Sequence, residues 1–352
     1  MKITGVLVDI LVNTDPDVYG GFVVYERGKK VIYVEVLKSI YGMLISAILW
    51  YKQFRSDLET QDFIFNPYDP CVANRIVDGH KKTIIFHVDD VMSSHIKPQV
   101  NDDFEIWLNK MYGEYGEVKT TRGDVYEYLG MKFIFDRKKG EVKVDMNDYI
   151  GNMIEEFPIK FDKTKRDKPI TLASTGLFEE DTSKKLGEKD RETFHKFTAK
   201  GLFASKRARQ DIAPAIYILC TIVKSPGRKD WNKLVRMMKF LHQTKNDVLT
   251  LSADRGLHNI EWYVDALFAV HPNFKSHTGA NQVFKGGKGS VQSVSAKQNL
   301  NTTSSTTSEL VGVDQVLPLM LWTPLFLEAQ GYQFKTKKVY QDNNSTILLE
   351  TN

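Results

Sequence analysis

Three acidic residues in the last third of the chain have the types and spacing that metal-dependent chemistry requires. Asp265 lies in a strand-like stretch, where we expect it to point inward, and Glu309 opens a helix-like stretch. Asp342 ends a second strand-like stretch around residues 339–340. Single acids in strands are usually structural or solvated, but a strand Asp, a helix Glu and a second strand Asp can converge on a metal pair that activates water against a phosphodiester. The sequence therefore predicts that the three carboxyl groups lie within roughly 4 to 8 Å of one another.

A second acidic pair, Asp89 and Asp90, follows the apolar, strand-like residues 84–88 at what we interpret as a hairpin turn. Adjacent carboxylates repel each other, and a divalent cation between them relieves that repulsion. Polymerases use such carboxylates to hold two Mg²⁺ ions, which activate a 3′-hydroxyl and stabilise the leaving pyrophosphate. A solvated Asp-Asp turn is the alternative, because acidic residues are common in turns.

One segment carries cations that could contact a phosphate backbone. The four cations are Lys200, Lys206, Arg207 and Arg209. We expect Phe194, Phe197 and Leu202 to form the buried face of this segment. A solvated helix face is the alternative interpretation.

The cysteines and histidines favour no metal site of their own. Cys71 and Cys220 are far apart, and each lies beside apolar residues, so the sequence predicts neither a disulfide framework nor a zinc site, and it favours a reducing compartment. His271 and His277 lie six residues apart near Asp265. A metal site is possible there, but no Cys joins them, so plain loop histidines are the favoured interpretation.

Composition places the chain among folded proteins of two or three domains. It has 352 residues, of which 42% are hydrophobic and 26% charged, so it can bury a core. The net charge of +4 suits a polyanionic partner without requiring one. No run of eighteen apolar residues occurs, so we expect no membrane-spanning helix, and the start of the chain does not resemble a signal peptide.

The elements that must position these residues follow from local patterns. Ile48, Tyr51 and Leu58 lie on one face of a predicted helix that begins at Leu44 and ends near Glu59. Further strands are predicted at 31–36, 71–76, 84–88, 128–135 and 141–144, with a short helix at 101–112. Beyond a polar linker we expect two helices, the second capped by Asp230, and then a β-rich part from about 260, a helix at 308–329 and a strand around 339–340. The fold class is therefore α/β and α+β.

Several of these stretches resemble, in order, the motifs of the pol polyprotein of copia-type (Ty1/copia) retrotransposons. Residues 39–43, 50–51, 66–71, 86–90 and 128–131 resemble the Leu-Tyr-Gly-Leu, Trp-Tyr, Asp-Pro-Cys, Tyr-Val-Asp-Asp and Phe-Leu-Gly-Met stretches of its reverse transcriptase. Residues 265–266, 304–309 and 342–345 resemble the Asp-Ala, Ser-Ser-Thr-Glu-Ala-Glu and Asp-Asn-Ser-Ala stretches of its ribonuclease H. Residues 209–212 resemble its Arg-Pro-Asp-Ile segment, with Gln210 in place of Pro. Together these matches cover nearly the whole chain.

The resemblance implies a fold, a metal and partners. It implies a partial reverse transcriptase palm and thumb over residues 1–160, a linker at 161–190, a helical connection region at 191–255 and a mixed-sheet, ribonuclease H-like domain at 256–352. It implies RNA-directed DNA polymerisation and cleavage of RNA in an RNA–DNA hybrid, with two Mg²⁺ per intact site. The implied partners are an RNA template, the hybrid and the rest of the pol polyprotein, with no membrane, in a cytoplasmic element particle or the nucleus.

Departures from the family pattern leave activity open. His87 replaces the usual Tyr, and Thr307 replaces a Glu that is not a metal ligand. The family's palm also needs an Asp on an earlier strand; Asp9 has a strand-like approach but the wrong following residues. We therefore expect that palm Asp to lie before Met1, and a fourth ribonuclease H acid to lie beyond Asn352. An active enzyme, a catalytically defective remnant and a host-adopted nucleic-acid-binding protein are the competing hypotheses, and the defective remnant is favoured.

Overall fold

The computed structural model describes residues 1–37, 40, 43–161, 171–253 and 259–351, which separate into two compact units. The first unit comprises Met1–Ile64 and Phe86–Val91, and the second comprises Phe65–Ile85 and Met92–Asn352. The expected mixed α/β and α+β class is confirmed, because helices alternate with four sheets. The boundaries expected near residues 160, 190 and 255 all fall inside the second unit, and they stay a prediction.

The first unit begins with a small antiparallel sheet in the order β1-β3-β2. Its elements are β1 (Lys2–Thr4), α1 (Val6–Thr14), α2 (Pro16–Tyr19), the 3₁₀ turn η1 (Gly20–Phe22), β2 (Val23–Glu26) and β3 (Lys29–Tyr33). The helix α3 (Leu44–Glu59) has the bounds that its apolar periodicity predicted. Phe54 and Leu58 of α3 are fully buried, and the Phe54 ring packs edge-on against Phe86, with ring centroids 5.0 Å apart.

A four-stranded sheet in the order β4-β5-β6-β7 and a helix follow. Their elements are β4 (Ile64–Asn66), β5 (Asp69–Val77), β6 (His80–His87), β7 (Asp90–Ser94), α4 (Pro98–Tyr112) and the 3₁₀ turn η2 (Gly113–Tyr115). Residues 72–77 of β5 pair antiparallel with residues 80–85 of β6. The turn between them places Asp78 and Gly79 at φ of 50° and 74°, as a two-residue hairpin turn requires.

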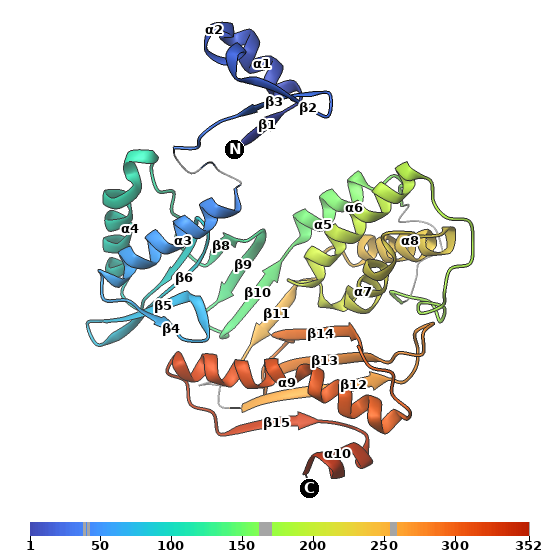
Figure 1. Ribbon diagram of the computed structural model, residues 1–352. Coiled ribbons are helices and arrows are strands. Elements are labelled where there is room, and N and C mark those ends of the chain that lie inside the picture. Colours follow the sequence, from blue (N-terminus) through green and yellow to red (C-terminus); the bar gives the residue numbers. More distant parts are fainter. Residues whose placement is uncertain (38–39, 41–42, 162–170, 254–258, 352) are drawn as a thin grey trace. The chain divides into compact units, whose positions relative to one another are not determined.

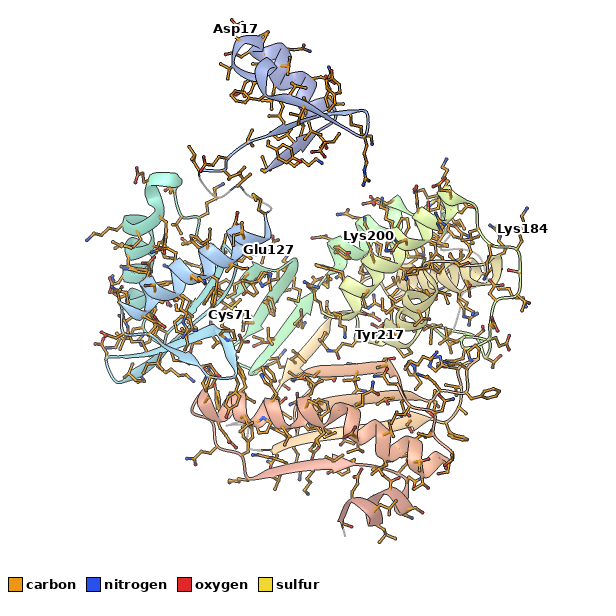
Figure 2. All side chains as sticks on the ribbon, viewed as in Figure 1. Asp17, Cys71, Glu127, Lys184, Lys200 and Tyr217 are labelled. Atoms are coloured by element: carbon orange, nitrogen blue, oxygen red, sulfur yellow. The ribbon has the colours of Figure 1, made fainter. Side chains whose placement is uncertain are left out.

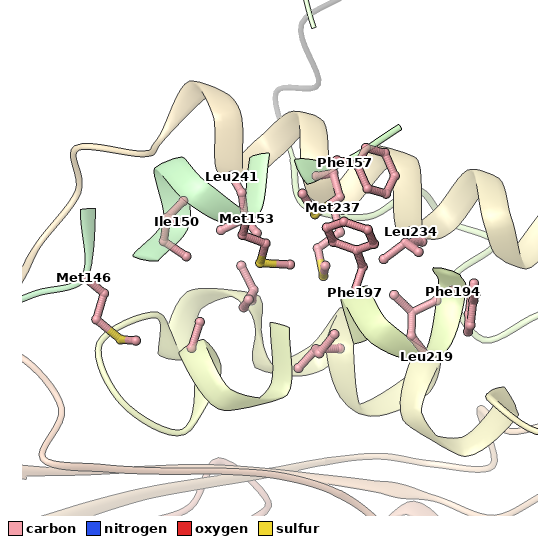
Figure 3. Close-up of a cluster of buried hydrophobic side chains, with 14 of the residues drawn as sticks. Met146, Ile150, Met153, Phe157, Phe194, Phe197, Leu219, Leu234, Met237 and Leu241 are labelled. Atoms are coloured by element: carbon pink, nitrogen blue, oxygen red, sulfur yellow. The ribbon is translucent and has the colours of Figure 1, made fainter. Parts of the chain in front are cut away.

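A further antiparallel sheet and four helices form the largest core of the second unit. The sheet runs in the order β11-β10-β9-β8, from β8 (Val125–Tyr128), β9 (Met131–Asp136), β10 (Glu141–Asp145) and β11 (Leu249–Ser252). The helices are α5 (Asn147–Glu156), α6 (Glu188–Ser205), α7 (Ala213–Ile222) and α8 (Arg228–Gln243), with the 3₁₀ turn η3 (Gln210–Ile212) before α7. Figure 3 shows Phe157, Phe197 and Met237 meeting in this core from the end of α5, from α6 and from α8.

The sequence predicted two helices in this region, whereas the structure has three. The additional helix is α7, whose residues Ile216 and Leu219 are fully buried in the main core while Ala215 and Ile218 pack against Leu177. Because α7 is apolar on most sides, it lacks the polar face that helical periodicity detects. The first part of the predicted linker, 162–170, lies outside the described residues, and Leu177 shows that the later part packs against α7.

The last part of the chain is a mixed sheet covered by a long helix (Figure 1). The strands are β12 (Asn259–Leu267), β13 (His277–Phe284), β14 (Gln292–Lys297) and β15 (Thr336–Tyr340), and the helices are α9 (Ser305–Ala329) and α10 (Asn344–Thr351). The sheet order is β14-β13-β12-β15, with β15 parallel to β12 and the other pairs antiparallel. Alternate residues of β12 are buried, and Ile260, Trp262 and Val264 pack with Val316 and Met320 of α9.

The helix α9 differs from one expectation. By length and composition alone it could cross a membrane, although we expected no such helix. Polar residues interrupt the apolar sequence of α9, so it contains no unbroken run of eighteen apolar residues. Within the second unit, α9 packs its Val316 and Met320 face against β12.

Candidate metal centre

The architecture of the last sheet brings two acids to one edge. The parallel pairing of β15 with β12 ends at Tyr340, which lies opposite Tyr263. The chain then leaves the sheet, and Asp342 follows two residues later. Asp265 lies two residues beyond Tyr263, on the part of β12 that extends past this pairing.

The third acid is held by the first turns of α9. Ser304 caps the helix: its hydroxyl accepts a hydrogen bond from the Thr307 backbone N–H, at 3.1 Å. Glu309 follows two residues after Thr307, and it is 5% exposed. The helix packs closely at the next turn, where a Cβ on Gly312 would lie 3.5 Å from the Ala266 Cβ.

The three carboxyl groups converge. One oxygen each from Asp265, Glu309 and Asp342 lies within 4.8 Å of the others, so the predicted convergence is confirmed. Asp265 and Asp342 are exposed and Glu309 is buried. The expectation that Asp265 points inward was wrong. Successive residues of β12 face opposite sides of the sheet, and the buried side carries Ile260 and Val264, whereas Asp265 lies on the other side.

Electrostatics at the centre favour a bound cation. Burial raises the pKa of Glu309, and the negative charges of Asp265 and Asp342 raise it further. Hydrogen bonds from the Gln341 side chain and the Ala266 backbone N–H act in the opposite direction. Three clustered carboxylates offer the oxygen ligands that hard divalent cations such as Mg²⁺ take. The donor set therefore fits a divalent metal.

A cavity of about 640 Å³ borders the centre within the second unit. Asp265, Gly279 and Asn281 line it from the sheet, and Asp211 and Leu249 line it from the helical region. The face of β12 and β13 opposite α9 thus leaves space beside Asp265.

Asp89 and Asp90 are in a different situation. Asp89 lies in the turn between β6 and β7, Asp90 begins β7, and both are exposed. Among the described residues, Asp265, Glu309 and Asp342 form a group of three convergent metal-ligating side chains, and no such group includes Asp89 or Asp90. Asp9, the sequence candidate for a third acid, lies on the helix α1 rather than on a strand, and Lys30 pairs with it at 2.7 Å.

The predicted phosphate-contacting residues divide into two groups. Lys206 is exposed, with its Nζ 4.8 Å from the centre of the Tyr217 ring (Tyr217 and Lys200 are labelled in Figure 2). Lys200 pairs with Glu156 at 2.6 Å, and this lysine and Lys196 lower the pKa of Glu156 to about 2. Lys206 and Lys200 therefore remain candidates for a phosphate contact, but Lys200 would have to leave its ion pair with Glu156.

The two arginines are held by the protein. The Arg207 guanidinium lies 3.5 Å from the centre of the Phe203 ring, and its Nε donates to the Leu129 carbonyl at 3.3 Å. Arg209 is 2% exposed and donates to both Asp211 carboxylate oxygens, at 2.9 and 2.7 Å, and to the Thr244 carbonyl at 3.0 Å. The expectation that Arg209 contacts a phosphate is corrected, because its donors are already used inside the protein. The buried face expected for this segment is confirmed at Phe194 and Phe197, while Leu202 is half-buried.

His271 lies in the loop before β13 and His277 begins β13, and the two side chains form a buried pair. Their Nε2 and Nδ1 atoms lie 3.1 Å apart, and the His277 Nε2 lies 2.8 Å from the Ser295 hydroxyl. Burial lowers the pKa of each to about 4. No third metal-ligating side chain joins them among the described residues. The structure therefore gives them a structural role.

Sequence reasoning missed Gln341. Its side-chain amide donates to Glu309 at 3.0 Å, and its carbonyl accepts from the backbone N–H groups of Asp342 and Asn343 at 2.8 and 3.2 Å. The sequence contained no motif that pointed to this contact, because Gln341 and Glu309 are 32 positions apart.

Comparisons with known proteins agree with the motifs. The chain is 26% identical over 337 residues to the retrovirus-related Pol polyprotein from transposon TNT 1-94 of Nicotiana tabacum, which covers 92% of this chain. It is 22% identical over 332 residues to the transposon Ty1-MR1 Gag-Pol polyprotein of Saccharomyces cerevisiae, which covers 90% of it. The chain spans 24% and 18% of these two relatives. The resemblance to copia-type retrotransposon polyproteins is thereby confirmed.

A solved structure of the foamy viral protease-reverse transcriptase in complex with RNA/DNA hybrid aligns with 91% of this chain and 41% of its own chain, with a TM-score of 0.49 and 12% identity. No protein-family model matches the chain.

Proposed function

We propose that this chain is a fragment of a retrotransposon RNA-directed DNA polymerase with a ribonuclease H domain, and that its ribonuclease H centre binds divalent metal and cleaves the RNA strand of an RNA–DNA hybrid. The convergence of Asp265, Glu309 and Asp342 within 4.8 Å carries the proposal. The similarity to two retrotransposon polyproteins over nine tenths of the chain supports the substrate class.

The three residues have separable roles in this proposal. Glu309 is the buried anchor: its carboxylate is held by donors from two sides and repelled by the other two acids. Asp265 and Asp342 are exposed and present their oxygens toward an incoming phosphodiester. Bound Mg²⁺ would supply an activated water and neutralise charge on the phosphate.

A cleavage assay tests the proposal. The full chain is incubated with Mg²⁺ and a hybrid whose RNA strand carries an end label. We expect RNA cleavage that Asp265→Asn abolishes and that Asp314→Asn, an exposed acid on the same helix α9, leaves unchanged. No cleavage by the wild-type chain, or equal loss in both variants, would contradict the proposal.

We further propose that the polymerase site is defective. Asp89 and Asp90 are exposed in a turn, and among the described residues no third acid converges with them. Two carboxylates without a third bind a divalent cation weakly, because the cation then has fewer oxygen ligands from the protein.

Nucleic-acid binding without catalysis is the second candidate function. The exposed cation Lys206, with Lys200 nearby on α6, is the observation that favours it. Binding through phosphates weakens with salt by roughly 0.7 to 0.9 of a log unit per contact for each decade of salt. Changing both lysines to Gln should lower hybrid affinity and flatten the salt slope, measured by fluorescence anisotropy. Hybrid binding without cleavage would favour this second function, and an unchanged slope would place the nucleic acid elsewhere.

A further inference from the structure

One side chain joins two of the three acids of the metal centre. Gln341 lies between the end of β15 and Asp342, and it is half-buried. Its Nε2 donates to Glu309 Oε2 at 3.0 Å. Its Oε1 accepts from the backbone N–H groups of Asp342 and Asn343. A single amide therefore contacts the carboxylate of one acid and the backbone of another.

We propose that Gln341 is a positioning residue that fixes the carboxylate of Glu309 relative to Asp342, so that both present oxygens to the same cation. This inference rests on the proposed metal centre. The Ala266 backbone N–H binds Glu309 from β12, and Gln341 binds it from the turn after β15. With two donors fixed, the carboxylate keeps one orientation, as partners of metal ligands commonly ensure.

The chemistry of the amide suits this task. An amide supplies a hydrogen-bond donor without a charge, whereas a Lys or Arg at the same place would compete with the cation for Glu309. The same amide also supplies an acceptor, so Gln341 binds the turn that carries Asp342 while it orients Glu309. The geometry of a metal site depends on neighbouring residues that fix the side chains of its ligands.

The turn has other tethers that touch none of the acids. Asn343 Oδ1 accepts a hydrogen bond at 3.0 Å from the backbone N–H of Thr346, in the first turn of α10. The Thr346 hydroxyl, which is fully buried, donates to the Thr306 carbonyl in the first turn of α9 at 3.2 Å. Thr346→Val therefore removes a tether of the turn without changing a contact to Glu309, and it is the matched control.

Two substitutions separate the two roles of the amide. Gln341→Met keeps the length of the side chain but removes its donor and acceptor. Gln341→Asn keeps an acceptor that can bind the N–H two residues on, as Asn does in turns, but it is too short to reach Glu309. A residue that only stabilised the turn would tolerate Asn, whereas a residue that orients Glu309 would not.

Calorimetric titration of the full metal-free chain with Mn²⁺ tests the inference, together with the Mg²⁺ concentration that gives half-maximal hybrid cleavage. We expect Gln341→Met and Gln341→Asn each to weaken Mn²⁺ binding about tenfold, and to raise the half-maximal Mg²⁺ concentration similarly. Thr346→Val should lower the melting temperature and leave the Mn²⁺ dissociation constant unchanged. Circular dichroism verifies that each variant is folded at the temperature of the titration.

Different failures have different meanings. If wild type binds Mn²⁺ and both Gln341 variants bind it equally well, Gln341 has no positioning role, while the metal centre stands. If Gln341→Asn binds like wild type and Gln341→Met does not, the residue acts only through the turn, which also overturns the inference. If the wild-type chain binds no Mn²⁺, the proposed centre falls and the role of Gln341 falls with it.

Discussion

The buried pair His271 and His277 should make the second unit sensitive to mild acid. The two rings are 6% and 5% exposed, and their nitrogens lie 3.1 Å apart. In that contact one nitrogen donates and the other accepts, so at least one ring must be neutral. Protonation of both rings would place two donors against each other beside Lys297, whose charge also lowers the pKa of His271.

The magnitude follows from the two pKa values. Burial lowers each pKa from 6.5 to about 4, so between these limits the unfolded chain binds protons that the folded chain does not. The free energy of unfolding therefore falls as the pH falls through this window, by about 1.4 kcal/mol per pH unit for each ring. One ring alone contributes a loss of about 3 kcal/mol, complete near pH 4. Above pH 6.5 both rings are neutral in either state, and the contribution is fully present.

Two measurements test this prediction. Proton NMR of the imidazole Cε1–H resonances gives the pKa of each ring directly, and urea unfolding at several pH values gives the slope. The double variant His271→Gln with His277→Gln removes the titration, and subtracting its slope from that of wild type cancels the contribution of the carboxylates. His195→Gln is the control, because His195 is exposed.

Resonances of His271 and His277 that titrate near 6.5 would refute this prediction, and so would a parallel loss of stability in wild type and the double variant between pH 6.5 and 4. A steeper loss in wild type that His195→Gln retains would support it.

Three further predictions follow from buried or exposed charges. Arg209→Met should lower the free energy of unfolding by about 2 kcal/mol, because it removes charged hydrogen bonds to Asp211 and leaves the Thr244 carbonyl without its donor. The exposed control Lys206→Gln should change this free energy by less than about 0.5 kcal/mol. Equal effects of the two substitutions in urea unfolding would contradict a stabilising role for the buried Arg209. Lys82 is 1% exposed, and burial lowers its pKa from 10.5 to about 8. The free energy of unfolding of wild type should therefore rise by about 3 kcal/mol relative to that of Lys82→Met as the pH rises from 8 to 10.5. A difference in stability that stays constant with pH would be inconsistent with a buried amine. The chain should not extend a primer on an RNA template with Mg²⁺; extension that Asp89→Asn abolishes would overturn the proposed defect.

The sequence predicted those elements whose residues repeat with a clear period. The helix α3 has its predicted bounds, although of the three residues that indicated its period Leu58 is fully buried and Ile48 is exposed. The turn at Asp78-Gly79 was predictable because only a few residue types adopt its backbone conformation easily. In contrast, α1 was missed, and Asp9 was assigned a strand-like approach, because the apolar residues 6–8 and 10–12 on either side of Asp9 show no helical period.

The candidate site was predictable in its acids and not in their surroundings. Asp265, Glu309 and Asp342 could be selected because each stands at a defined point of a strand or helix, and the order of those elements limits where their ends can meet. The burial of Arg209 was not predictable, because it depends on Thr244, which lies 35 positions away. Local pattern carries information over a few residues, whereas these contacts depend on how distant elements pack.

Gln341 shows why the two kinds of information have to be combined. Its position beside Asp342 is local, and its contact with Glu309 exists only because β15 runs parallel to β12 and α9 crosses the same strand. An antiparallel β15 would place residue 342 at the opposite end of β12, far from Asp265. The direction of one edge strand therefore decides whether three acids and one amide form a metal centre or remain four separate polar residues.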